Sequence, residues 1–172
     1  RSELGIPCLI QEQNSFAGLT NKTLAKKARK ICVAYEGMER FFPKDSILLT
    51  GNPVRQNLLN NSLTREECAA TFGINPAKRT ILLIGGSLGA RTLNESVIKN
   101  LSYIAASPVQ FIWQTGSYYK KEISRTLDVK GKPSNLIVTD FISHMDQAYY
   151  LADLVISRAG AGTISELCLL GK

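Results

Sequence analysis

The sequence predicts an α/β protein built on doubly wound parallel sheets, and three observations carry this prediction. Short apolar runs alternate with stretches of helical periodicity along the chain. Several of these runs are continuous in Val, Ile and Leu, which is typical of parallel strands covered on both faces. From Thr80 onward the order is strand, helix, strand, helix, strand, short helix, strand, helix, and this order favours right-handed crossovers within one sheet.

The individual elements follow from the apolar runs and from the residues that begin and end helices. Thr64 and Glu67 have the spacing of a capping box, and Gly73 is placed to end the helix that they begin. The predicted strands are Ile6–Ile10, Lys30–Val33, Ile47–Leu49, Thr80–Ile84, Val109–Trp113, Asn135–Val138 and Leu154–Ile156. The predicted helices are Asn21–Arg29, Arg65–Phe72, Arg91–Leu101, Tyr118–Leu127 and Ile164–Leu170.

Residues 51–63 interrupt this alternation, because they are rich in Asn and contain a Pro. We therefore expect a domain boundary near Arg55, with residues 1–55 as the end of one domain and 56–172 as most of a second. The chain begins at Arg1 without an initiator Met and ends directly after an apolar helical run. We interpret it as a fragment; the alternative is a complete small protein with a processed N-terminus.

The amino-acid composition and net charge indicate the class of protein and the type of ligand or partner. The 172 residues are 44% hydrophobic and 20% charged, which is ordinary for a globular protein. No apolar stretch reaches the roughly 18 residues that span a bilayer. The four cysteines have long, irregular spacings, which favours reduced thiols over disulfides or a zinc site. A net charge of +7, spread along the chain, suits an anionic ligand or an anionic lipid surface and argues against a nucleic-acid partner.

The first motif is the run GGSLGA at residues 85–90, which follows a predicted strand and opens a predicted helix. Glycines there allow a tight turn and a close approach of the backbone to a ligand, and the free N–H groups at the start of the helix favour an anion. The spacing is not that of a Rossmann fingerprint. Ala90 and Arg91 stand where a Walker A loop has Gly and Lys, so nucleotide hydrolysis of that type is not expected. A plain strand-to-helix turn is the alternative.

The second motif is the run SRAGAGT at residues 157–163, again between a predicted strand and a predicted helix. Both loops should emerge at the carboxyl edge of one sheet, where ligands bind. Two such helix starts suggest a ligand with a diphosphate or a similar anion. Thr163 and Glu166 also have the spacing of a capping box, so spacing alone leaves two interpretations of Glu166, a helix cap or a ligand of a ribose diol.

Other candidate catalytic groups are few. His144 is the only histidine, and it is expected to be a solvated loop residue beyond a strand. The aspartates form no DxD pair, so no metal site and no cofactor are expected. No residue of the chain is assigned as the catalytic base.

Together these stretches resemble the MurG family of UDP-N-acetylglucosamine-dependent glycosyltransferases. The resemblance rests on the two glycine-rich motifs, with Asn94 after the first and Glu166 after the second, and on two earlier runs, QEQN with AGLTN at residues 11–21 and GNPVR at 51–55. They occur in the family's order across almost the whole chain. One departure is Gln11, where the family usually has His, and we assign no role to that position.

The resemblance implies the GT-B fold, in which two Rossmann-like domains face each other across the active site. Residues 1–55 would then end the acceptor-side N-terminal domain, and 56–172 would form most of the donor-binding C-terminal domain. The histidine usually considered for catalysis would lie upstream of Arg1, and a Gln-containing loop for the donor sugar would lie downstream of Lys172.

The resemblance also implies roles for two residues before the first glycine-rich motif and for one residue within it. Asn14 would contact the donor sugar, and Arg55 would face the diphosphate. Ser87 would hydrogen-bond a phosphate.

Later positions complete the implied donor site. Ile142 would read the uracil edge through its backbone. Ala161, Gly162 and Thr163 would line the sugar and phosphates. Glu166 would hold the ribose.

The implied reaction is an inverting transfer of N-acetylglucosamine from UDP-N-acetylglucosamine to the 4-hydroxyl of lipid-linked N-acetylmuramyl-pentapeptide, during peptidoglycan synthesis. The protein would then act peripherally at the anionic, cytoplasmic face of the bacterial inner membrane. This fragment alone is expected to be inactive. Two alternatives stay open: another UDP-sugar GT-B enzyme, such as a glycolipid transferase or an epimerase, and a non-catalytic donor-binding subunit.

Overall fold

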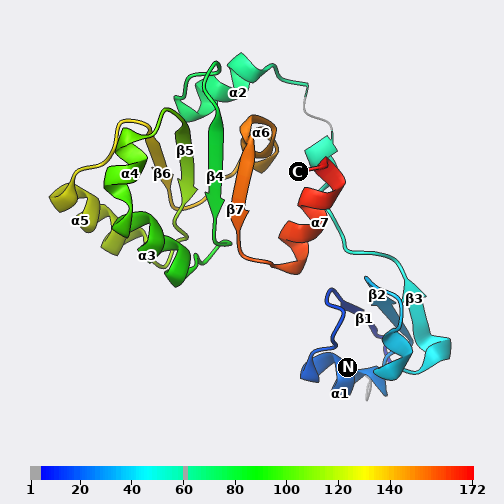
Figure 1. Cartoon of the computed structure of the whole chain (residues 1–172). Helices are drawn as coiled ribbons and strands as arrows, with labels where there is room; N and C mark the ends of the chain where they lie inside the picture. Colours follow the sequence, from blue (N-terminus) through cyan, green and yellow to red (C-terminus); the bar gives the residue numbers. More distant parts are fainter. Residues whose placement is uncertain (1–4, 60–61) are drawn as a thin grey trace. The chain divides into compact units, whose positions relative to one another are not determined.

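The computed structural model describes residues 5–59 and 62–172, which divide into two compact units, Arg1–Val54 and Arg55–Lys172 (Figure 1). Residues 1–4, part of the predicted first domain, and 60–61, part of the predicted break at 51–63, lie outside the described residues. No helix among the described residues is both long enough and apolar enough to cross a membrane.

The first unit contains a three-stranded parallel sheet with the order β1-β2-β3. Its core consists of Ala17, Ala25, Ile31, Val33, Met38 and Phe42. The elements are β1 (Leu9–Glu12), α1 (Leu19–Ala25), β2 (Lys30–Val33), the 3-10 turns η2 (Met38–Arg40) and η3 (Lys44–Ser46), and β3 (Ile47–Leu49).

Two elements of this unit are shifted relative to the sequence prediction. The first strand was predicted at Ile6–Ile10 but lies at Leu9–Glu12, because the chain stays extended into polar residues and buries Glu12. The first helix was predicted at Asn21–Arg29 but ends at Ala25, so Lys26 and Lys27 follow the helix. The strands at Lys30–Val33 and Ile47–Leu49 are confirmed.

The second unit contains a four-stranded parallel sheet with the order β6-β5-β4-β7. The helices α3, α4 and α5 pack on one face of the sheet, and α6 lies on the other (Figure 1). The strands are β4 (Thr80–Ile84), β5 (Gln110–Gln114), β6 (Leu136–Thr139) and β7 (Leu154–Ser157). The helices are the 3-10 turn η4 (Gln56–Leu59), α2 (Arg65–Phe72), α3 (Arg91–Lys99), α4 (Leu101–Ala106), α5 (Lys120–Lys130), α6 (Met145–Leu151) and α7 (Ala161–Leu170).

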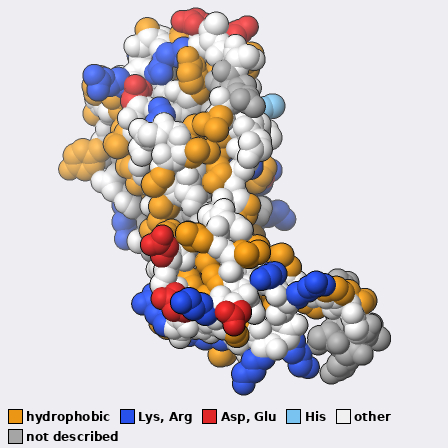
Figure 2. Space-filling view, turned by 90° about the vertical axis from the view of Figure 1, so that its right-hand side faces the viewer, with side chains coloured by type: hydrophobic (Ala, Val, Ile, Leu, Met, Phe, Trp, Pro, Cys, Tyr) orange, Lys and Arg blue, Asp and Glu red, His pale blue; other side chains and the backbone are white. Residues whose placement is uncertain are grey.

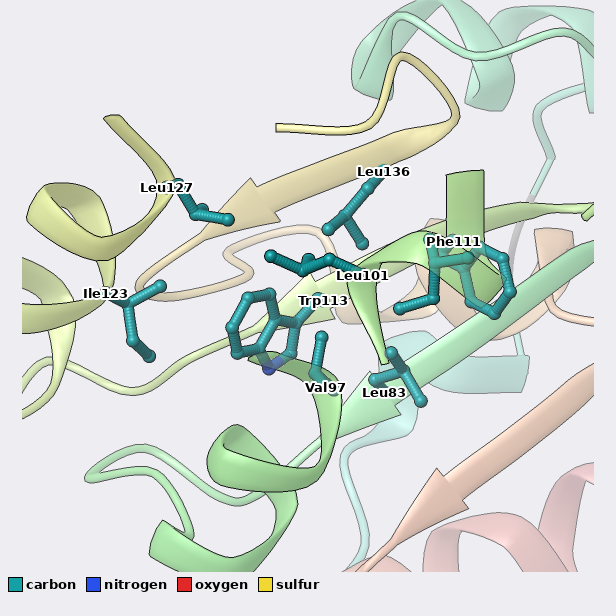
Figure 3. Packing of buried hydrophobic residues seen from close by; sticks show 9 residues of the cluster. Leu83, Val97, Leu101, Phe111, Trp113, Ile123, Leu127 and Leu136 are labelled. Atoms are coloured by element: carbon teal, nitrogen blue, oxygen red, sulfur yellow. The ribbon is translucent and has the colours of Figure 1, made fainter. Parts of the chain in front are cut away.

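The main core of this unit lies between the sheet and α3, α4 and α5 (Figure 3). Trp113 of β5 is fully buried there among aliphatic side chains. Alternate residues of the central strands, such as Leu82 of β4 and Ile112 of β5, are also fully buried, so both faces of these two strands are covered. This explains the continuous apolar runs in the sequence. The cluster comprises Leu83, Val97, Leu101, Ile104, Phe111, Trp113, Ile123, Leu127 and Leu136.

Local sequence signals account for several helix ends. The capping box of α2 is confirmed, since the Thr64 hydroxyl accepts from the Glu67 N–H and the Glu67 carboxylate accepts from the Thr64 N–H. Gly73 ends α2 in the left-handed conformation, as predicted. The single helix predicted at Arg91–Leu101 is in fact two, because Asn100 leaves helical geometry and separates α3 from α4.

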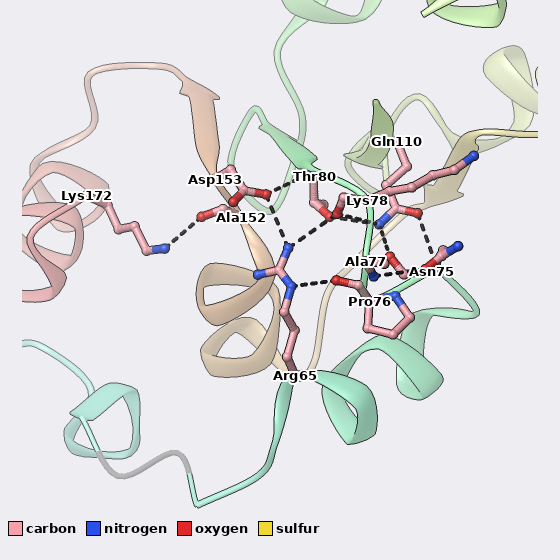
Figure 4. Close-up of polar contacts among 10 residues, drawn as sticks. All are labelled: Arg65, Asn75, Pro76, Ala77, Lys78, Thr80, Gln110, Ala152, Asp153 and Lys172. Carbon is pink, nitrogen blue, oxygen red and sulfur yellow. Dashed lines mark hydrogen bonds and ion pairs between the residues drawn. The ribbon is translucent and has the colours of Figure 1, made fainter. Parts of the chain in front are cut away.

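Charged side chains are distributed over the surface, and Figure 2 shows Lys and Arg at several separate places on one face, with hydrophobic and acidic side chains between them. At the amino end of the large sheet, the Asp153 carboxylate accepts hydrogen bonds from the Thr80 backbone N–H at 2.7 Å and from Arg65 Nη2 at 3.2 Å (Figure 4). Burial alone would raise the pKa of Asp153, but these donors outweigh it and hold the pKa below its usual value.

Candidate functional site

The strand order of the second unit places a crevice between the ends of β4 and β7. After β4 the sheet grows through β5 and β6 on one side, and the chain then returns to add β7 on the other side of β4. In open parallel sheets this reversal opens a crevice at the carboxyl ends of the strands, where ligands bind. The two glycine-rich loops meet there, around a hollow of 470 Å³ lined by Ile84, Gly85, Gly86, Arg158, Ala159, Gly160 and Thr163.

The loop after β4 is held in a conformation that requires glycine. Gly89 has φ +89°, and a Cβ there would collide with the carbonyl oxygen of Thr115 at the end of β5. Asn94 of α3 secures the same contact, because its amide donates to that Thr115 oxygen at 2.8 Å and accepts from the Trp113 indole at 3.1 Å. These contacts hold the end of the loop against the end of β5.

The loop after β7 leads into α7, which begins three residues earlier than predicted. Its N-cap is Gly160, with an extended backbone and no capping side chain. The first helical hydrogen bond runs from the Ile164 N–H to the Gly160 carbonyl, at 2.9 Å. The N–H groups of residues 161–163 thus point out of the first turn, which gives this ten-residue helix an anion-binding end.

The capping-box interpretation of Thr163 and Glu166 is therefore wrong. Thr163 lies within the first turn of α7 and is not its N-cap, so Glu166 lies one turn further along the helix and does not cap it. Its carboxylate is used elsewhere. Oε1 accepts from Nε and Nη2 of Arg55, each at 3.0 Å, and Oε2 accepts from the Tyr149 hydroxyl at 2.9 Å.

A second hollow, of 140 Å³, joins most of the predicted donor residues. Among the eleven residues that line it are Arg55, Ser87, Ile142, Thr163 and Glu166. They come from distant segments, and the fold brings them together at one end of the sheet. The wall is completed by Ile84, Gly86, Gln114, Phe141, Met145 and Tyr149.

The remaining predicted residues lie near this hollow or in the other unit. Ala161 and Gly162 form the first two positions of α7, directly before Thr163. Asn14 belongs to the first unit, where its backbone N–H and its side-chain amide both donate to Glu12 Oε1, at 3.0 and 3.2 Å. His144 is exposed and directly precedes α6, in agreement with its prediction as a loop residue.

Gln114 links the two sides of the hollow, a role that the sequence analysis did not predict. It is the last residue of β5 and is only 2% exposed. Its Nε2 donates to the Gly86 carbonyl at 3.0 Å, and its Oε1 accepts the Ile142 N–H at 3.2 Å. The Ile142 N–H is thereby occupied, so uracil recognition through this backbone would use the carbonyl oxygen. A polar residue closing a buried apolar strand was the available signal.

Glu12 has a comparable role in the first unit. It is 3% exposed, and its carboxylate accepts from the N–H groups of Asn14 and Gly18 and from the Asn21 amide. Burial alone would raise its pKa, but the hydrogen bonds from Gly18, Asn21 and Asn14 outweigh this and lower it. Glu12 thus remains a carboxylate and shapes the turn that presents Asn14.

Comparison with known proteins places this arrangement in a family. The pattern described as the glycosyltransferase family 28 C-terminal domain matches residues 80–172, which contain both glycine-rich loops. The chain belongs to glycosyltransferase family 28. The match covers the whole large sheet, from β4 to α7.

Two relatives of this chain share the name UDP-N-acetylglucosamine--N-acetylmuramyl-(pentapeptide) pyrophosphoryl-undecaprenol N-acetylglucosamine transferase. The one from Phocaeicola vulgatus is 63% identical over 98% of the chain, and the one from Parabacteroides distasonis is 62% identical over 98%. The chain spans 45% of the length of each of these relatives.

Solved structures show the same fold. The crystal structure of Acinetobacter baumannii MurG matches 98% of the chain with a TM-score of 0.58 and 33% identity, and the chain covers 45% of it. A glycosyltransferase from Rickettsia africae matches 87% of the chain with a TM-score of 0.57, but at 12% identity this likeness concerns the fold alone. The predicted α/β class of GT-B type is confirmed.

Proposed function

We propose that this chain is the donor-binding part of an inverting glycosyltransferase, which moves N-acetylglucosamine from UDP-N-acetylglucosamine to the 4-hydroxyl of lipid-linked N-acetylmuramyl-pentapeptide in peptidoglycan synthesis. One observation supports this most directly. Two glycine-rich helix starts flank the reversal of strand order, beside a hollow lined by an arginine and a carboxylate whose side chain is 12% exposed. The names of the relatives supply the identity of donor and acceptor.

A nucleoside diphosphate fits the chemistry of the hollow. The free N–H groups at the start of α7 suit the phosphates, and so does the Arg55 guanidinium. The Glu166 carboxylate suits a ribose diol, since it only accepts hydrogen bonds. The backbone at Ile142 would then contact the uracil edge, and Ser87 would bind a phosphate from the opposite loop.

The reaction would use these groups to stabilise the leaving diphosphate. The acceptor hydroxyl oxygen attacks the anomeric carbon, the bond from that carbon to the β-phosphate oxygen breaks, and UDP leaves with the electron pair. Negative charge grows on the diphosphate, and preorganised N–H groups together with Arg55 offset it. One such donor is typically worth about 3 kcal/mol of barrier. The hydroxyl proton passes to a base that we do not assign to this chain.

Residues 1–55 would end the acceptor-side domain and residues 56–172 would form most of the donor-side domain. On this proposal Asn14 contacts the donor sugar, and the turn built on Glu12 presents it. The acceptor is membrane-bound, so the protein would work peripherally at the anionic cytoplasmic face of the inner membrane. Lys26 and Lys27, which follow α1, are candidates for contact with anionic lipid.

Titration calorimetry of this chain with UDP and with uridine tests the donor site. UDP should bind about 10-fold more tightly or better, because only UDP supplies an anion to the helix starts. Equal affinities would refute the diphosphate assignment. A chain extended to the length of the relatives should transfer N-acetylglucosamine to the lipid-linked acceptor, whereas an epimerase would convert UDP-N-acetylglucosamine without an acceptor. Failure of both reactions would leave only a donor-binding subunit.

A further inference from the structure

The hydroxyl of Tyr149, on α6, hydrogen-bonds the Glu166 carboxylate that we assign to the ribose. Tyr149 itself has not been given a role so far. Its side chain is among the largest that are fully buried, with 1% exposure. Its hydroxyl donates to Glu166 Oε2 at 2.9 Å, across from α6 to α7. A buried phenol needs a hydrogen-bond partner, and here that partner is a residue of the donor hollow.

The two groups that hold Glu166 differ in their freedom to move. Arg55 binds Oε1 from a side chain that is 51% exposed, whereas the Glu166 side chain is 12% exposed. The guanidinium therefore has solvent to move into, whereas the Tyr149 side chain is almost fully buried. When a ligand arrives, Arg55 is the partner that exchanges, and Tyr149 is the partner that stays.

We propose that Tyr149 is a positioning residue for nucleoside-diphosphate binding: its hydroxyl anchors Glu166 through Oε2 and so keeps Oε1 directed at the ribose diol. This inference rests on the proposed function, because it takes Glu166 as the ribose ligand. With Oε2 anchored, the carboxylate cannot rotate away when Arg55 leaves it for the diphosphate. The ribose then meets an acceptor already in place, which lowers the entropic cost of binding.

The surroundings keep Tyr149 in the donor form that this role requires. Burial is the main cause that raises the pKa of its phenol well above the ordinary value. The negative charge of Glu166 and the hydrogen bond to it raise this pKa further, while Arg55 opposes them. The hydroxyl therefore stays protonated at neutral pH and continues to donate.

The test is Tyr149→Phe, which removes the hydroxyl and keeps the ring. Calorimetry of the chain should show UDP affinity about 10-fold lower, since a hydrogen bond to a charged group is lost. Affinity for 2′,3′-dideoxy-UDP, which lacks the diol, should be the same as in the parent. In a Glu166→Gln background, Tyr149→Phe should have no further effect on UDP. Tyr150→Phe, on the exposed next residue, is the matched control and should change nothing.

The outcomes separate this inference from the function on which it rests. If the parent does not prefer UDP to uridine, the proposed function fails. If the parent binds UDP and prefers it to the dideoxy analogue, but Tyr149→Phe binds UDP as the parent does, the positioning role is wrong. If Tyr149→Phe loses the same affinity for UDP as for the dideoxy analogue, the role of Tyr149 is purely structural, and the positioning role is also overturned. Placing 4-aminophenylalanine at position 149 restores a donor and should recover UDP affinity, which guards against a folding defect in Tyr149→Phe.

Discussion

Gln114 is predicted to join two ligand-binding loops, and its replacement by Leu tests that role. The substitution keeps a similar volume in the buried strand but removes both hydrogen bonds. The bond to the Gly86 carbonyl ties down the loop after β4, and the bond from the Ile142 N–H ties down the segment after β6. Both segments line the 140 Å³ hollow that we propose to bind the donor, so their release should affect stability and ligand binding together.

The structure gives the size of the effect on stability. Ile142 is 3% exposed, so its N–H would lose its partner without gaining water, at a cost of about 1–3 kcal/mol. Gly86 is exposed, so water can replace Gln114 at its carbonyl, and that loss is the smaller one, about 0.5–1.5 kcal/mol. Gln114→Leu should therefore lower the free energy of unfolding by about 1.5–4.5 kcal/mol.

Gln110, at the other end of the same strand, provides a matched control. It is also buried, and it bridges Asn75 and Thr80 with three hydrogen bonds, far from the carboxyl edge (Figure 4). Urea denaturation should show comparable destabilisation for Gln110→Leu and Gln114→Leu. Calorimetry with UDP should show weaker binding only for Gln114→Leu. Equal UDP affinities in the two variants, or an unchanged urea midpoint for Gln114→Leu, would refute the reasoning.

Three further predictions concern other parts of the chain. Thr64→Ala should lower the free energy of unfolding by about 1 kcal/mol because it removes a cap, whereas Thr163→Ala should cost less than about 0.5 kcal/mol; equal urea midpoint shifts would contradict the assigned helix starts. The lowered pKa of Asp153 contributes stability that is present above about pH 4 and is lost as the pH falls through the folded-state pKa. Asp153→Asn should therefore flatten the decline of the urea midpoint between about pH 5 and pH 2. A decline parallel to that of the parent would argue against this. Co-sedimentation with anionic vesicles should fall with salt and with Lys26→Glu or Lys27→Glu, each basic residue adding about 1 kcal/mol; insensitivity to both would leave these lysines as solvated surface.

The parts of the fold that could be predicted from sequence are those set by neighbouring residues. Continuous apolar runs marked the strands of the large sheet, most clearly β4 and β5, which are covered on both faces. The capping box at Thr64 and Glu67 was identified from spacing alone. The same spacing at Thr163 and Glu166 misled, because the start of α7 is decided by the extended backbone at Gly160, which the spacing does not encode.

The contacts that complete the site could not be predicted, because they join residues far apart in the chain. Arg55 and Glu166 are separated by 111 positions, and Gln114 is separated from each of its two partners by 28. The sequence around a glutamine at the end of a strand is the same whether its side chain is solvated or hydrogen-bonds two loops. Glu12 presents the same difficulty, since its burial depends on a turn made by the residues that follow it.

The ion pair between Arg55 and Glu166 has a consequence for selectivity among phosphate compounds. A simple polyphosphate would have to draw Arg55 away and leave the largely buried Glu166 carboxylate without its counter-charge. A free nucleoside would face an occupied carboxylate and give Arg55 nothing in return. Only a molecule that carries a diol and a diphosphate at the right separation compensates both partners at once. On the proposed function, the pair should therefore discriminate against simple phosphates and free nucleosides before any sugar is recognised.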